Sequence, residues 1–77
     1  MEIKVLGTGC AGCKALEQAV REVVAEMALD ATVEKVEDLM EIMNYNVMSM
    51  PGLVVDGKVV SAGKKLSKNE VTAILTK

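Results

Sequence analysis

The sequence predicts an α/β domain in which four strands and three helices follow one another in the order βαβ and then αββα. Short apolar runs rich in β-branched residues alternate with stretches whose apolar residues recur every three or four positions. An Asp-Gly pair between two of the apolar runs predicts a hairpin. The chain has 77 residues, which is near the lower limit for a self-sustaining core. We therefore expect residues 1–77 to form a single domain around one four-stranded mixed sheet.

The first predicted strand and helix lie on either side of a glycine-containing loop. Residues 2–6 alternate polar and apolar side chains and end at Gly7, which is typical of a short strand entering a tight loop. We expect the longest helix to begin at Cys10 and to bury one stripe of residues. The stripe consists of Cys13, Leu16, Val20, Val23 and Met27. Glu17 and Arg21 fall on the other side, where such a pair indicates a solvated face.

The middle of the chain predicts a second strand and a short second helix. Residues 31–36 are rich in β-branched side chains, and two acids then precede a short apolar stretch. The apolar residues of this stretch are Leu39, Met40, Ile42 and Met43. We expect Met40, Met43 and, in the first helix, Met27 to fill the core, because the chain has no Phe and no Trp.

The last third predicts a hairpin and a third helix. Residues 53–55 and 58–60 are apolar runs separated by Asp56-Gly57. Both central positions of the favoured hairpin turn need positive φ, so this pair predicts that the two runs are antiparallel neighbours. Ser67 begins a capping-box sequence, and we therefore expect a helix over residues 67–76.

Composition argues against several classes of function. The hydrophobic content of 51% indicates a globular protein, and a net charge of −2 with one aromatic residue and no basic run argues against nucleic acid as a partner. No apolar run approaches the ~20 residues that span a bilayer. Residues 1–4 lack the features of a signal peptide. We expect a monomeric, cytoplasmic protein without membrane attachment.

Cys10 and Cys13 are the only cysteines, and they lie at a predicted helix start. Unpaired backbone N–H groups and the helix dipole favour a thiolate there. This geometry suits thiol–disulfide exchange, with Cys10 as the nucleophile and the deeper Cys13 as the second thiol. A soft-metal carrier is the alternative, since two thiolates bind Cu(I) or Zn(II), and Met48 and Met50 could add thioether ligands for Cu(I).

The predicted final helix favours exchange over metal carriage. Small metal-binding domains with a Cys-x-x-Cys loop run βαββαβ and end in a strand, whereas residues 67–76 here predict a helix. A structural zinc site would need about four ligands, and the chain has two cysteines and no histidine. We therefore expect no bound metal and no cofactor.

Three segments of the chain resemble the thioredoxin-like fold in its minimal, glutaredoxin-sized form. These segments are Thr8-Gly9-Cys10-Ala11-Gly12-Cys13, Val47-Met48-Ser49-Met50-Pro51 and Asp56-Gly57. Together they are similar to the small redox-active disulfide proteins of archaea and bacteria. The resemblance implies that Pro51 is a cis-proline facing the cysteines, and that substrate binds at Met50, Pro51, Gly9, Ala11 and Gly12. It also implies protein disulfides as substrates and a disulfide reductase as electron donor.

The chain departs from ordinary thioredoxins in its proton chemistry. Thioredoxins keep a buried aspartate late in the first strand, and here Lys4 is the nearest charged residue to that position. Proton transfer at Cys13 is therefore left to water, Lys4 or the substrate. The dipeptide Ala11-Gly12 replaces Gly-Pro between the cysteines.

Overall fold

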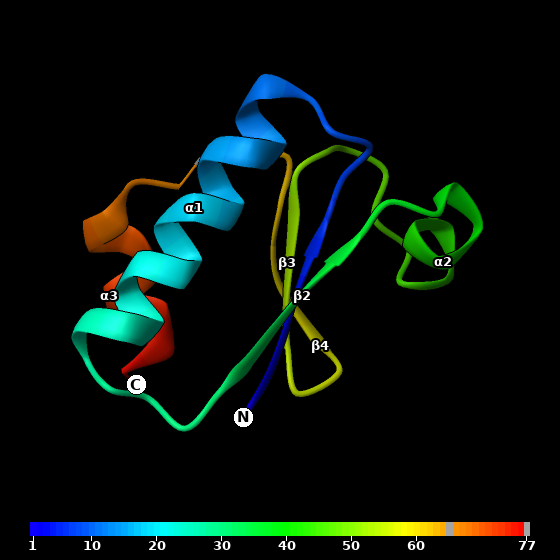
Figure 1. Ribbon diagram of the computed structural model, residues 1–77. Helices are drawn as coiled ribbons and strands as arrows, with labels where there is room; N and C mark the ends of the chain where they lie inside the picture. The colour runs from blue at the N-terminus through cyan, green and yellow to red at the C-terminus, as the bar shows by residue number, and fades with distance from the viewer. Residues whose placement is uncertain (65, 77) are drawn as a thin grey trace.

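The computed structural model describes residues 1–64 and 66–76, and its elements follow the predicted order (Figure 1). They are β1 (Glu2–Leu6), α1 (Ala11–Glu26), β2 (Thr32–Val36), α2 (Leu39–Asn44), β3 (Gly52–Val55), β4 (Lys58–Ala62) and α3 (Lys68–Leu75). The strand order is β2-β1-β3-β4. Strand β1 pairs with β2 in parallel and with β3 antiparallel, and β3 pairs antiparallel with β4. The prediction of an α/β fold with a four-stranded mixed sheet and three helices is confirmed.

Helices cover the two faces of the sheet unequally. Figure 1 shows α1 and α3 together on one side of the strands and the short α2 on the other. Strand β1 contributes buried side chains to both faces of the sheet, because alternate residues of a strand point to opposite faces. Ile3 and Val5 are buried on the α1 and α3 side, whereas Leu6 is buried on the α2 side.

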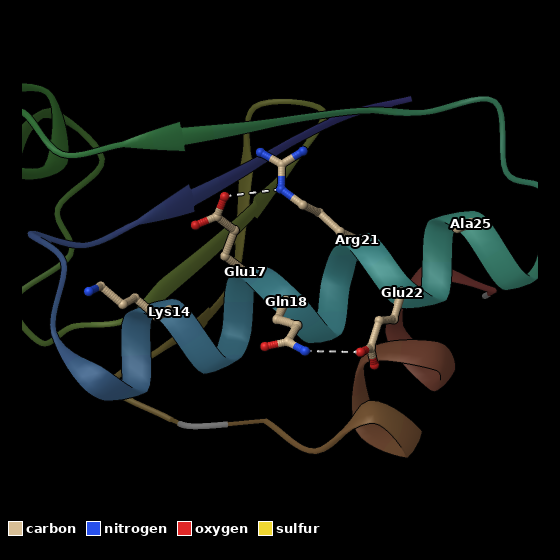
Figure 2. A pocket seen from close by; sticks show the side chains of 6 residues that line it. All are labelled: Lys14, Glu17, Gln18, Arg21, Glu22 and Ala25. Carbon is tan, nitrogen blue, oxygen red and sulfur yellow. Dashed lines mark hydrogen bonds and ion pairs between the residues drawn. The ribbon is translucent and has the colours of Figure 1, made fainter.

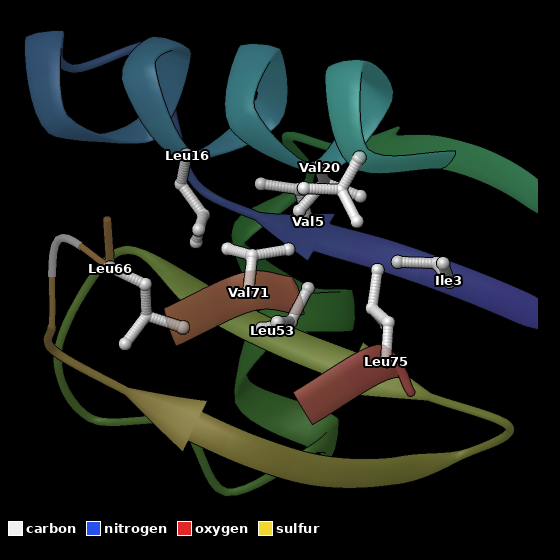
Figure 3. Close-up of a cluster of buried hydrophobic side chains, with 9 residues drawn as sticks. Ile3, Val5, Leu16, Val20, Leu53, Leu66, Val71 and Leu75 are labelled. Carbon is white, nitrogen blue, oxygen red and sulfur yellow. The ribbon is translucent and has the colours of Figure 1, made fainter. Parts of the chain in front are cut away.

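The larger core lies between α1, α3 and the sheet (Figure 3). Its buried members among the described residues are Ile3, Val5, Leu16, Val20, Val23, Leu53, Leu66, Val71 and Leu75. The helical spacing of Leu16, Val20 and Val23 places them on one face of α1, as predicted. This core holds the start of α1, and with it the cysteines, against the end of β1.

The smaller core lies under α2. Its buried members in the described part of the chain are Leu6, Val36, Ile42, Val47 and Val54. Tyr45 and Met50 pack against them while remaining partly exposed. Helix α2 contributes a single buried residue, Ile42.

The prediction that three methionines fill the core is wrong. The exposed fractions are 44% for Met27, 71% for Met40 and 59% for Met43. Met27 is the C-cap of α1, beyond its last buried turn. Helix α2 has only six residues and lies on the sheet through Ile42, so Met40 and Met43 fall on its outer side. Apolar periodicity over so short a helix does not tell which side is covered.

The predicted turn and cap chemistry is present. Asp56 and Gly57 have φ of 50° and 82°, as the hairpin turn requires. Ser67 and Glu70 form the reciprocal capping box at the start of α3. No helix in the described residues combines the length and the hydropathy that crossing a bilayer requires.

Candidate redox site

The two cysteines lie at the N-terminus of α1 and form a disulfide. Cys10 is the N-cap residue, with extended backbone angles, and Cys13 lies in the first turn. Their Cα atoms are 5.0 Å apart. Cys10 is exposed to solvent, whereas Cys13 is only 5% exposed. One sulfur of the pair is thus accessible to a large partner and the other is not.

The backbone of α1 favours negative charge on the Cys10 sulfur. The backbone N–H of Cys13 donates to Cys10 Sγ at 3.1 Å. The first turn of α1 contains no acidic side chain, so the positive end of the helix dipole is not offset there. Both effects stabilise a thiolate when the disulfide is reduced.

Gly7 makes room for the buried sulfur. A Cβ atom at this position would lie 2.3 Å from Cys13 Sγ and 2.8 Å from Cys13 Cβ, closer than atoms approach without displacement. The Gly7 N–H also donates to the carbonyl of Val36 at 2.9 Å, which extends the pairing of β1 with β2. Sequence reasoning interpreted Gly7 only as the end of a strand and missed this role. Its position three residues before Cys10 was the available signal.

The resemblance implied that Pro51 faces the cysteines, and the structure places it there. The Met50-Pro51 peptide bond is cis. Pro51 Cδ lies 3.9 Å from the position that a Cβ would take at Gly12, between the two cysteines. The carbonyl of Pro51 accepts a hydrogen bond of 2.9 Å from the N–H of Gly63, which anchors the entry into β3 to the end of β4.

The remaining predicted substrate positions surround Cys10. Met50 is joined to the redox loop because Thr8 Oγ1 donates to its Sδ at 3.6 Å. Gly9 has φ of 90°, a conformation that side chains rarely adopt. Ala11 is exposed and begins α1. The structure therefore brings Gly9, Ala11 and Gly12 from one segment together with Met50 and Pro51 from another.

Lys4 is held on the α2 side of the sheet. Its Nζ donates to the hydroxyl of Tyr45 at 3.3 Å and lies 3.5 Å from Glu2 Oε1. The hydrogen bond to Tyr45 and, less strongly, the contact with Glu2 raise the pKa of Lys4 above its usual value of 10.5. Among residues 1–64 and 66–76 no charged side chain is buried, so Cys13 has no buried acid beside it.

Two surface hollows are lined by residues other than the cysteines. One, of about 460 Å³, runs along the outer face of α1 and is lined by Lys14, Glu17, Gln18, Arg21, Glu22 and Ala25 (Figure 2). Arg21 pairs with Glu17 at 3.0 Å, and the Gln18 amide donates to Glu22 at 3.2 Å, as expected for a solvated face. The other, of about 250 Å³, is lined by Lys4, Glu41, Asn44 and Tyr45.

The described residues contain no group of three or more His, Cys, Asp or Glu side chains that could hold a metal ion. The described elements follow the order βαβ and then αββα, which differs from the βαββαβ order of the metal-carrier fold considered above. Neither observation favours metal carriage.

Comparison with known proteins agrees with the geometry. A family model described as a thioredoxin domain matches residues 1–76. A protein named thioredoxin from Methanothermobacter thermautotrophicus is 41% identical over 76 residues, which cover 99% of each chain. A protein named thioredoxin from Methanocaldococcus jannaschii is 36% identical over 69 residues, which cover 90% of this chain and 79% of that relative. With its disulfide at the start of α1, the chain is a thiol–disulfide oxidoreductase that belongs to the thioredoxin family.

Proposed function

We propose that the protein reduces protein disulfides, with Cys10 as the nucleophile and Cys13 as the resolving thiol. The observation that carries the proposal is the unequal exposure of the two sulfurs. Cys10 is exposed at the helix start, whereas Cys13 is 5% exposed and lies against Gly7. Only the exposed sulfur can approach a disulfide on another protein without rearrangement of the fold.

The exchange takes place in two steps that conserve electrons. The Cys10 thiolate attacks one sulfur of the substrate disulfide, that bond breaks, and the leaving sulfur is protonated while a mixed disulfide forms. Cys13 then loses its proton and attacks the Cys10 sulfur, which releases the second substrate thiol. The substrate gains two electrons and two protons, and the Cys10–Cys13 disulfide forms. A disulfide reductase, the kind of partner that the family implies, returns the protein to its dithiol form.

The residues around Cys10 suit an extended substrate segment. Gly9, Ala11 and Gly12 present little side-chain bulk beside the sulfur. Met50 precedes the cis bond to Pro51 and offers its backbone next to the same loop. We infer that the substrate strand binds along Met50 while its disulfide lies over Cys10.

Lys4 is a poor proton carrier for Cys13. Because its pKa is raised, the ammonium group gives up its proton less readily than an ordinary lysine near neutral pH. Its Nζ is also engaged by Tyr45 and Glu2. We infer that water or the leaving substrate thiol exchanges the proton at Cys13.

We expect the reduction potential to be that of a reductant. The thiolate is stabilised by the dipole of α1 and by the N–H of Cys13, and we expect these two effects to favour the dithiol form only moderately. A potential of about −200 to −270 mV, as in glutaredoxins and thioredoxin, is the consequence. Equilibration with glutathione redox buffers and counting of free thiols measures it. A value near −120 mV would replace the reductase assignment with an oxidase.

We further propose that residues 1–77 act as one monomeric domain in the cytoplasm. Both cores of the described residues close on the same sheet, which supports a single domain. Both cysteines are used by the redox pair, which suits a compartment where structural disulfides are rare.

Two cysteine variants test the assignment of roles. Cys10→Ser should abolish reduction of a protein disulfide, whereas Cys13→Ser should accumulate a mixed disulfide with the substrate. Alkylation of the reduced wild-type protein should label Cys10 first, and mass spectrometry of the peptides identifies the site. Faster labelling of Cys13, or trapping by Cys10→Ser instead, would reverse the two roles.

A further inference from the structure

Helix α2 and the loop after it expose large apolar side chains that the fold does not need. The exposed fractions are 53% for Leu39, 71% for Met40, 59% for Met43 and 95% for Met48. We call these four residues the α2 methionine surface. Met43 lies four positions after Leu39 and three after Met40, so the three side chains border one another on the helix surface, and Met40 lies opposite the buried Ile42. Exposed apolar side chains grouped in this way are typical of an interaction surface.

This surface is continuous with the redox loop. Glu37, just before the N-cap of α2, has Oε2 only 3.5 Å from the position that a Cβ would take at Gly9. At the other end of the helix, Met48 lies two residues before Met50, which contacts Thr8. Figure 1 shows the segment from α2 into β3 passing close to the loop between β1 and α1. A substrate strand held at Cys10 can therefore extend over α2.

The charge around the surface selects the chemistry of the partner. Helix α2 and the two residues before it carry three acids, Glu37, Asp38 and Glu41, and no Lys or Arg, while Lys4 of β1 lines a hollow together with Glu41. Glu37 pairs with Lys35 at 3.7 Å, whereas Asp38 and Glu41 form no ion pair among the described residues. A partner with apolar and basic side chains complements this pattern. A second copy of the chain would place Asp38 and Glu41 against the same acids, which is unfavourable.

We propose that the α2 methionine surface docks an apolar, basic segment that flanks the disulfide of a protein substrate. The proposal rests on the proposed disulfide reductase activity and adds a specificity surface outside the redox loop. Methionine suits this task because its unbranched, polarisable side chain repacks around different apolar shapes. The surface then accepts many substrates that share composition rather than sequence.

The first test uses three synthetic peptides that contain the same disulfide ring. One is the bare ring, one carries a flanking segment of Leu and Lys, and one carries a flanking segment of Leu and Glu. The wild-type protein should reduce the Leu-Lys peptide with a KM about tenfold below that of the bare ring, a difference of about 1.4 kcal/mol. The KM of the Leu-Glu peptide should be lowered by a smaller factor.

Matched variants locate the effect. Met40→Gln with Met43→Gln keeps side-chain length but removes the apolar surface, and should abolish the KM advantage of the flanked peptide while leaving the rate with the bare ring unchanged. Met27→Gln, at an exposed methionine at the far end of α1, is the control and should behave as wild type. Glu41→Gln should reduce the preference for Leu-Lys over Leu-Glu.

Methionine footprinting of the trapped complex tests for contact with the α2 methionine surface without substituting any of its residues. Cys13→Ser should be linked to the Leu-Lys peptide through Cys10 and treated with a methionine-oxidising reagent. Met40, Met43 and Met48 should be protected relative to the free protein, whereas Met27 should not.

The outcomes separate the two proposals. If the wild-type protein does not reduce even the bare ring, the reductase assignment fails and the docking proposal fails with it. If the ring is reduced but the flanking segment has no effect on KM and gives no protection, only the docking surface is overturned. Light scattering could instead show that the wild-type protein is a dimer and that Met40→Gln with Met43→Gln is a monomer. That result would also overturn the docking proposal, because the α2 methionine surface would then serve self-association.

Discussion

The two faces of the sheet differ in how completely they are covered. The face under α1 and α3 buries nine side chains among the described residues, whereas the face under α2 buries five. The first face has two helices and the second has one helix of six residues. Burial of apolar area is the main source of stability, so stability comes mostly from the first face.

The redox site is built from residues that belong to both faces of the sheet. Cys10 and Cys13 belong to α1, whose start is held by the larger core, and Pro51 follows the loop from α2. The thiols are thus fixed by rigid packing, while the substrate side is built from a thinly covered face with exposed side chains. The proposed reduction of protein disulfides needs fixed chemistry and adaptable recognition, and we infer that the unequal faces supply one each.

Truncating one buried side chain on each face should show the largest difference. Leu16→Ala leaves a cavity between α1 and the sheet and should lower the free energy of unfolding by about 2–5 kcal/mol. Ile42→Ala should cost about 2 kcal/mol, at the lower end of that range, because the short α2 can settle into the space. Urea unfolding of both oxidised variants measures this. An equal or larger loss for Ile42→Ala would show that the two faces contribute alike.

Adding one methyl group at the redox loop should have the next largest effect. Gly7→Ala places a Cβ against the Cys13 sulfur and should lower the free energy of unfolding of the oxidised protein by about 1–3 kcal/mol. Gly12→Ala is the control, since its Cβ would make an ordinary contact with Pro51 at 3.9 Å and adds helix propensity of roughly 0.5–1 kcal/mol. Thermal unfolding should separate them. A stable Gly7→Ala protein would mean that the Cys13 sulfur moves freely.

Removing one helix cap on each face compares the helices themselves. Ser67→Ala deletes the side-chain acceptor for the Glu70 N–H at the start of α3, and should cost about 1 kcal/mol of global stability. Asp38→Ala deletes the acceptor for the Met40 N–H at the start of α2. It should mainly speed local amide exchange in α2, because that helix adds little to the core. Hydrogen exchange measures both, and global destabilisation by Asp38→Ala would contradict the comparison.

The smallest expected effect is a pH dependence on the α2 face. The pKa of Lys4 is raised above 10.5 in the folded protein by Tyr45 first and Glu2 second. Its contribution to stability is therefore fully present below pH 10.5 and is lost as the pH rises through the folded-state value. The stability difference between wild type and Lys4→Met should stay constant from pH 7 to about 10 and shrink above that. A stability difference between the two proteins that grows above about pH 10 would contradict a raised pKa of Lys4.

Local sequence determined the elements of this protein. The type and order of the strands and helices, the Asp56-Gly57 turn and the Ser67 capping box all follow from interactions within a few residues, and the structure confirms them, although β4 extends to Ala62, two residues beyond the predicted run. The placement of Cys10 at a helix start is equally local, because it depends on the loop before it and the apolar stripe after it. Thiol chemistry could therefore be predicted from the sequence.

Tertiary structure decided which surfaces are covered. The exposure of Met40 and Met43 depends on α2 meeting the sheet through one residue, and no periodicity within six residues reveals that. The need for glycine at position 7 depends on the distance from its backbone to a sulfur six residues later, across the turn into α1. Such contacts form between segments whose spacing is set by packing of the whole sheet. The sequence thus determined the chemistry of the site, and packing determined its shape and its open face.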